Sequence, residues 1–105
     1  MYELIKELLA SVWNTIKKII VKVLNFFKNI VSWFKEPSRL RKIKEDKNKM
    51  AVVIKEKMQN GDYEVINVLF DKNESEILDA EVISAGDIDQ ETHNKFKDKD
   101  MVILN

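Results

Sequence analysis

Apolar side chains recur along residues 3–35 at alternating steps of four and three positions. This spacing is typical of a helix with an apolar stripe, sustained here for about four heptads. Neither proline nor glycine interrupts the stripe, and Pro37 ends it because proline cannot continue the hydrogen-bond ladder of a helix. The pattern therefore predicts one long amphipathic helix within residues 1–36. Its stripe positions are Ile5, Leu9, Val12, Ile16, Ile19, Val23, Phe26, Ile30 and Trp33.

A second apolar row widens this face, and most of the lysines of the segment lie opposite it. A broad face that carries tryptophan and phenylalanine, with lysine on the polar side, is typical of a helix lying in a membrane interface. Charges interrupt the segment too often for a transmembrane span, and it lacks the pattern of a signal peptide. We expect an interfacial helix, although the stripe also fits self-association as a coiled coil or packing against the C-terminal half. The second row is Trp13, Ile20, Phe27 and Phe34.

Residues 37–49 form a basic segment that contains only two apolar side chains before Met50. Next to an interfacial helix, a polybasic segment favours contact with anionic headgroups, each lysine or arginine contributing about 1 kcal/mol. A solvated linker or short helix and a nucleic-acid contact are the alternatives. The candidate residues for binding an anionic surface are Lys35, Arg39, Arg41, Lys42 and Lys44.

The C-terminal part, residues 50–105, alternates short apolar runs with polar turns. The turn at Asn60-Gly61 predicts a hairpin with a two-residue loop, which would pair Met58 with Tyr63. The predicted order is β-β-β-α-β, in a small antiparallel sheet whose open edge could bind a partner strand. The chain as a whole is thus expected to be α+β. The predicted strands are 50–58, 63–71, 76–84 and 101–104, and the predicted helix is 88–97.

Basic and acidic side chains number 18 each, but they are unevenly distributed. Residues 1–49 hold twelve basic and five acidic side chains, whereas residues 50–105 hold six basic and thirteen acidic ones. Such asymmetry suggests an electrostatic partner for one half, or attraction between halves of neighbouring molecules. An anionic membrane suits the basic half, and mimicry of a nucleic acid stays open for the acidic half.

Candidate chemistry is sparse. The chain has no cysteine, one histidine (His93) and two glycines, which excludes thiolate sites, a multi-histidine metal site and a glycine-rich phosphate loop. Asp87, Asp89, Glu91 and Asp98 match four positions of a calcium-loop count, but Thr92 stands where the loop needs glycine and the last ligand is aspartate rather than glutamate. Acids at a helix start explain three of the four without a metal. We expect no enzyme, no cofactor and no metal.

The stretches VINVLFDKNESEILDAEVI and DIDQETHNKFKDKDMVIL, with the junction FKEPSRL, resemble small uncharacterised accessory proteins of tailless single-stranded-DNA bacteriophages. The resemblance implies a bacterial host cell and transfers no functional residue. Together these observations predict a peripheral accessory protein on the cytoplasmic face of a membrane, with the acidic domain binding a protein partner. The alternatives are a soluble self-assembling protein of the cytoplasm, built on a helical bundle, and a nucleic-acid accessory protein that uses residues 39–49.

Overall fold

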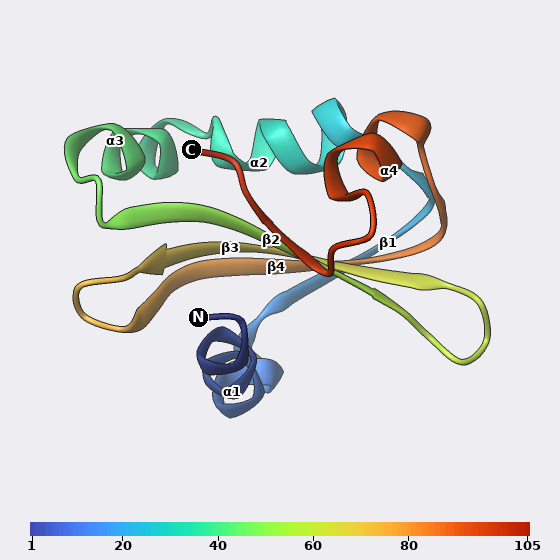
Figure 1. Ribbon diagram of the computed structural model, residues 1–105, viewed down its shortest axis with the longest axis horizontal. Helices are drawn as coiled ribbons and strands as arrows, with labels where there is room; N and C mark the ends of the chain where they lie inside the picture. Colours follow the sequence, from blue (N-terminus) through green and yellow to red (C-terminus); the bar gives the residue numbers. More distant parts are fainter.

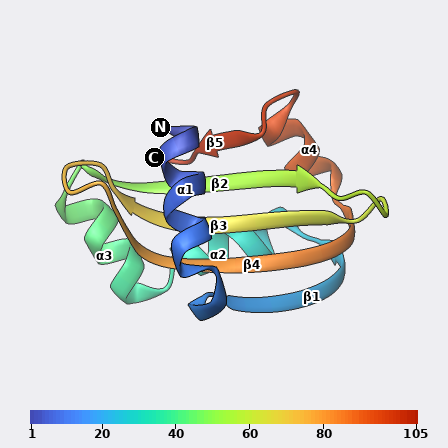
Figure 2. The same ribbon diagram turned by 90° about the horizontal axis from the view of Figure 1, so that it is seen from below.

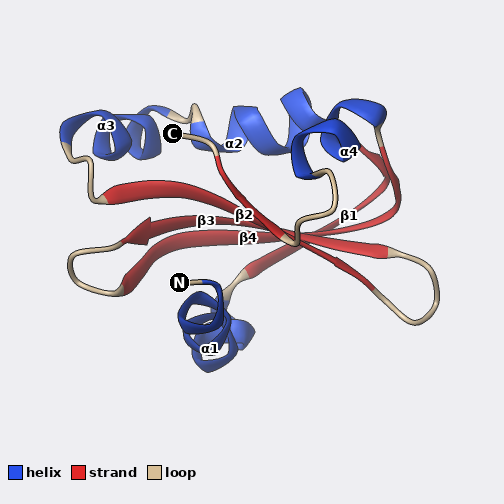
Figure 3. Ribbon diagram, viewed as in Figure 1, coloured by secondary structure: helices blue, strands red, loops and turns tan.

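The computed structural model describes all residues, 1–105, as a five-stranded mixed sheet with helical segments on both faces (Figures 1 and 3). The α+β class is confirmed. The elements in chain order are α1 (Tyr2–Val12), η1 (Trp13–Thr15), β1 (Lys17–Leu24), η2 (Phe26–Val31), α2 (Ser32–Phe34), α3 (Pro37–Glu45), β2 (Lys49–Lys57), β3 (Tyr63–Asp71), β4 (Glu76–Ile88), α4 (Gln90–Phe96) and β5 (Met101–Ile103).

The strands lie in the order β1-β4-β3-β2-β5. Three of the four pairings are antiparallel, and β1 pairs with β4 in parallel. Strand β4 runs four residues beyond its predicted end because Asp87 and Ile88 pair with the end of β1. The sheet therefore contains a strand from the segment predicted to be helical and four strands from the acidic part of the chain.

The prediction of one helix over residues 3–35 is wrong. The first helix ends at Val12, and the chain continues as the 3₁₀ turn η1, the strand β1 and the π-helical segment η2. Four of the eight residues of β1 are β-branched, which favours the extended backbone, and β4 supplies the hydrogen-bonding partner. An uninterrupted helix would also leave much of its apolar stripe uncovered, whereas the broken chain buries it on both faces of the sheet.

The β2–β3 hairpin is confirmed, but its predicted register is wrong by one residue. Met58 N–H donates to the Asp62 carbonyl at 2.7 Å, and Lys57 lies opposite Tyr63. The loop therefore has three residues and ends with Gly61 at φ 92°. This is a turn followed by a glycine bulge, the next most common hairpin connection after the two-residue loop, and only glycine adopts its backbone without strain.

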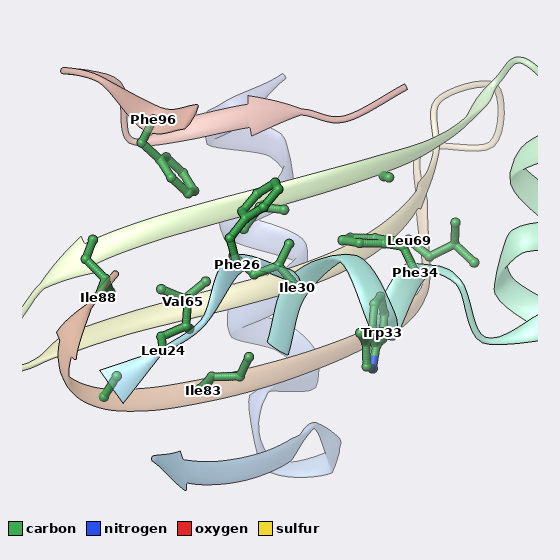
Figure 4. Packing of buried hydrophobic residues seen from close by; sticks show 13 residues of the cluster. Leu24, Phe26, Ile30, Trp33, Phe34, Val65, Leu69, Ile83, Ile88 and Phe96 are labelled. Atoms are coloured by element: carbon green, nitrogen blue, oxygen red, sulfur yellow. The ribbon is translucent and has the colours of Figure 1, made fainter. Parts of the chain in front are cut away.

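Both faces of the sheet are covered, so β3 is buried continuously from Val65 to Asp71 rather than at alternate positions. Helix α1 crosses the strands on one face, which we call the α1 face (Figure 2). There Ile5 and Leu9 pack with Ile54, Ile66 and other sheet residues. The other face is covered by η2, α2, α3 and α4, which we call the helical layer (Figure 1). Its core contains Leu24, Phe26, Ile30, Trp33, Phe34, Val65, Leu69, Ile83 and Phe96 (Figure 4).

Candidate functional site

The predicted membrane-facing stripe does not form one surface. Six of its thirteen residues are buried in the two cores, and Trp13, Ile16 and Ile19 are half-buried. Only four are exposed, and they belong to three different elements. The buried residues are Ile5, Leu9, Phe26, Ile30, Trp33 and Phe34, and the exposed ones are Val12, Ile20, Val23 and Phe27.

A groove of about 330 Å³ opens in the helical layer. Its walls come from η2, α2, α3 and α4, and its floor comes from β2 and the C-terminal residues. Seven of its ten lining residues are apolar. The apolar residues are Phe26, Val31, Phe34, Leu40, Ile43, Ala51 and Leu104, and the polar ones are Lys35, Lys95 and Asn105.

Local hydrogen bonds hold the first wall of the groove in place. Asn25 caps η2, because its side chain accepts from the Lys28 N–H at 2.8 Å. The buried side chain of Asn67, on β3, donates to the Asn29 carbonyl at 3.0 Å and so ties η2 to the sheet. Asp89 accepts from the Phe26 N–H at 3.1 Å, which joins the start of η2 to the start of α4.

Helix α3 supplies the second wall and begins at Pro37. The carboxylate of Glu36 caps it by accepting from Ser38 and Arg39, and the hydrogen bonds from Ser38 lower the pKa of Glu36. Proline at the first helical position costs nothing, since that residue needs no N–H partner. The floor is fixed by Asn105, whose side chain accepts from the Ala51 N–H at 2.8 Å.

The helical layer is basic. Residues 26–45 and 90–96 carry seven lysines and arginines against three acids. Lys35 and Lys95 line the groove, and Lys95 lies 5.6 Å from the centre of the Phe26 ring. Arg41 and Lys44 border a second, shallower hollow that shares Lys35 and Leu40 with the groove. Exposed basic groups therefore flank the apolar groove.

The predicted anionic-surface residues are not equivalent in the structure. Lys35, Arg41, Lys42 and Lys44 are exposed. Arg39 instead holds the fold together: its guanidinium donates to the Trp33 carbonyl at 2.6 Å and to Asp79 at 2.8 Å. It also lies 4.0 Å from the centre of the Trp33 ring. Arg39 is thus already paired, which leaves four of the five candidates available to a ligand.

Acidic groups gather on the sheet and its turns. Residues 58–88 carry eight acids and one lysine. On the α1 face, burial and then the nearby Glu56 carboxylate raise the pKa of Glu64, while Lys18 acts in the opposite direction. Burial also raises the pKa of Glu81 on β4, while Lys17 and Arg39 oppose the shift. The two charge signs are therefore separated between the helical layer and the β3–β4 region.

The acids at the start of α4 act as structural groups. Asp89 caps α4 by accepting from the Thr92 N–H at 2.9 Å. Partial burial acts to raise its pKa, but hydrogen bonds from Thr92 and Phe26 outweigh it and lower the pKa. Asp87 accepts from the Ile88 N–H at 2.8 Å. No group of three or more histidine, aspartate or glutamate side chains is arranged to hold a metal ion.

Sequence reasoning missed the groove and its Lys95, because the lining residues are separated by up to 79 positions, from Phe26 to Asn105. None of the helices has the length and apolar composition needed to cross a bilayer. Comparisons with protein-family models, with curated proteins and with solved structures found no match. The resemblance to phage accessory proteins stays a prediction.

Proposed function

We propose that this protein is a non-enzymatic, peripheral binding protein for an anionic membrane surface, which it contacts through the helical layer. The observation that carries the proposal is the uneven distribution of charge between the helical layer and the β3–β4 region. The helical layer holds an excess of basic groups around an apolar groove, and the β3–β4 region is strongly acidic. An anionic surface attracts the first region and repels the second, so the charge distribution also orients the molecule.

The proposed membrane contact is a surface of the folded protein rather than a single interfacial helix. Lys35, Arg41, Lys42, Lys44 and Lys95 are exposed and each contributes about 1 kcal/mol near an anionic leaflet. Headgroup phosphates would bind these cations, and acyl-chain carbons would pack in the groove. Electrostatic attraction supplies most of the affinity here, because no long apolar helix enters the bilayer.

The test is co-sedimentation of the full chain with vesicles that contain phosphatidylcholine alone or phosphatidylcholine with phosphatidylserine. We expect binding only to the anionic vesicles, and weaker binding as salt screens the charges. The double variant Arg41→Gln/Lys44→Gln loses about 2 kcal/mol, which corresponds to roughly 30-fold weaker binding.

The matched control is Lys57→Gln/Lys72→Gln, which also removes two exposed positive charges but from the hairpin ends of the sheet. It should bind anionic vesicles within about threefold of the wild type, since each surface charge acts mainly within a Debye length. Equal loss in both double variants would contradict the proposed surface. Tighter binding of single-stranded DNA than of anionic vesicles would replace lipid by nucleic acid.

A further inference from the structure

We infer that the outer edge of β1 binds an extended acidic segment of another protein by strand addition. Strand β1 has eight residues and forms one border of the sheet (Figure 2). The other border strand, β5, has only three residues. An unpaired edge of this length offers a row of free N–H and C=O groups, which is the usual template for an added strand.

The backbone of β1 indicates which groups are free. The Leu24 carbonyl accepts from the Asp89 N–H at 2.9 Å. The Lys22 carbonyl lies so close to Gly86 that a Cβ at that position would be only 3.3 Å from its oxygen. Even-numbered residues therefore direct their backbone groups toward β4. Because N–H and C=O directions alternate along a strand, Ile19, Val21 and Val23 direct theirs to the open edge.

Side chains on this edge are unusually exposed for their type. Ile20 is 87% exposed and Val23 is 55% exposed. Ile19 and Val21 pack against the helical-layer core, and the register partner of Lys18, Val82, belongs to the α1 core. Because side chains alternate along a strand, Lys18, Ile20 and Lys22 lie on the α1 face. An added strand would cover Ile20 and Val23 and place its own residues opposite the two lysines.

Charge selects the partner. The basic residues Lys17, Lys18 and Lys22 stand on β1 without an acid on the same strand, and none forms an ion pair with a carboxylate within 4.0 Å. Two ammonium hydrogens of Lys18 are directed at the Trp13 and Ile16 carbonyls, which leaves one donor for a ligand.

A second copy of β1 is a poor occupant. Pairing β1 with itself would bring six lysines into one two-stranded ribbon, and like charges across strands are destabilising. A segment with acid, apolar and acid at alternate positions instead matches Lys18, Ile20 and Lys22 in turn. This pattern reads the same in both directions, so it fits a parallel or an antiparallel partner.

The test measures binding of a fluorescein-labelled nonapeptide to the full chain by fluorescence anisotropy. The peptide carries glutamate at its third and seventh positions, isoleucine at its fifth and threonine elsewhere. The control peptide replaces both glutamates by lysine. We expect saturable binding of the acidic peptide alone, weakened about fivefold by Lys22→Glu, which should in turn favour the lysine peptide.

Amide hydrogen exchange separates strand addition from simple charge attraction. On addition of the acidic peptide, the amides of Ile19, Val21 and Val23 should gain protection, while those of Ile20 and Lys22 stay as protected as before. The variant Val23→Pro removes one outward donor and should weaken binding. Equal binding of both peptides, or protection that avoids the odd-numbered amides, would overturn the inference. So would concentration-dependent dimers that bury β1 in analytical ultracentrifugation.

Discussion

One face of the sheet is crossed by the single helix α1, whereas the other is covered by η2, α2, α3 and α4. The helical-layer core has thirteen buried apolar residues and the α1 core has eight. The larger core contains Phe26, Trp33, Phe34 and Phe96, while the aromatic residue buried in the smaller one is Phe70. The helical layer therefore stabilises the fold as well as forming the basic surface, whereas α1 covers the smaller of the two cores.

The largest effect should come from Trp33→Ala. Trp33 is 9% exposed, packs edge-on against Phe34 at 4.9 Å between ring centres, and lies beneath Arg39. Truncation leaves a cavity in the larger core and should lower the free energy of unfolding by about 3–5 kcal/mol. Chemical denaturation measures it. Phe27→Ala is the control, since Phe27 in the same layer is 61% exposed and should change stability by less than about 1 kcal/mol.

A smaller loss is expected from Leu9→Ala on the α1 face. Leu9 is 2% exposed, but α1 has only the sheet beneath it and can shift to fill part of the cavity. We expect a loss of about 2–3 kcal/mol, together with faster hydrogen exchange in α1 than in β3. A cost above that of Trp33→Ala would reverse the ranking of the two faces.

The β2–β3 hairpin and strand β1 show which parts of the fold could be predicted from the sequence and which could not. The apolar runs around Gly61 predicted the β2–β3 hairpin because both its strands and its turn are locally encoded. Residues 17–24 fit a heptad stripe and a β-branched strand equally well, and pairing with β4, distant in sequence, decided between them. Local periodicity contains no information about that partner.

The candidate site divides in the same way. The exposed positions of Arg41, Lys42 and Lys44 follow from a basic segment with few apolar residues, so composition alone located them. Composition does not predict the groove. Its lining residues belong to η2, α2, α3, α4, β2 and the C-terminal residues, and these segments meet only in the folded protein. Composition also fails to predict the role of Arg39. In the folded protein its guanidinium is bound to the Trp33 carbonyl and to Asp79, so it stabilises the fold.

A third, still smaller loss of stability is expected where Asp89 joins the start of η2 to the start of α4. Asp89→Ala removes the cap of α4 and the acceptor for the Phe26 N–H, and should cost about 1 kcal/mol at neutral pH. Because the pKa of Asp89 is lowered in the folded state, the stabilisation is present above its ordinary value of 3.8 and is lost as the pH falls through the folded value. Denaturation at neutral pH and at pH about 2 should therefore give a smaller difference between wild type and variant in acid.

The smallest effect should be a gain on the α1 face. Burial and Glu56 raise the pKa of Glu64, so its carboxylate form is disfavoured in the folded state above its ordinary value of 4.5. Glu64→Gln should stabilise the protein at neutral pH by a few tenths of a kcal/mol after solvent screening, and the gain should vanish at pH about 3. Thermal unfolding at the two pH values measures it, and a gain that persists in acid would contradict the electrostatic cause.

The parallel pairing of β1 with β4 has a consequence for synthesis. Residues 17–24 are synthesised 64 positions ahead of their hydrogen-bonding partner at residues 81–88. During that interval the segment has a helical stripe and no strand to join, and such long-range pairing slows folding. During synthesis, residues 17–24 should therefore be transiently helical and should unwind when β4 becomes available. A chain truncated after residue 75 lacks β4 and should keep this helix.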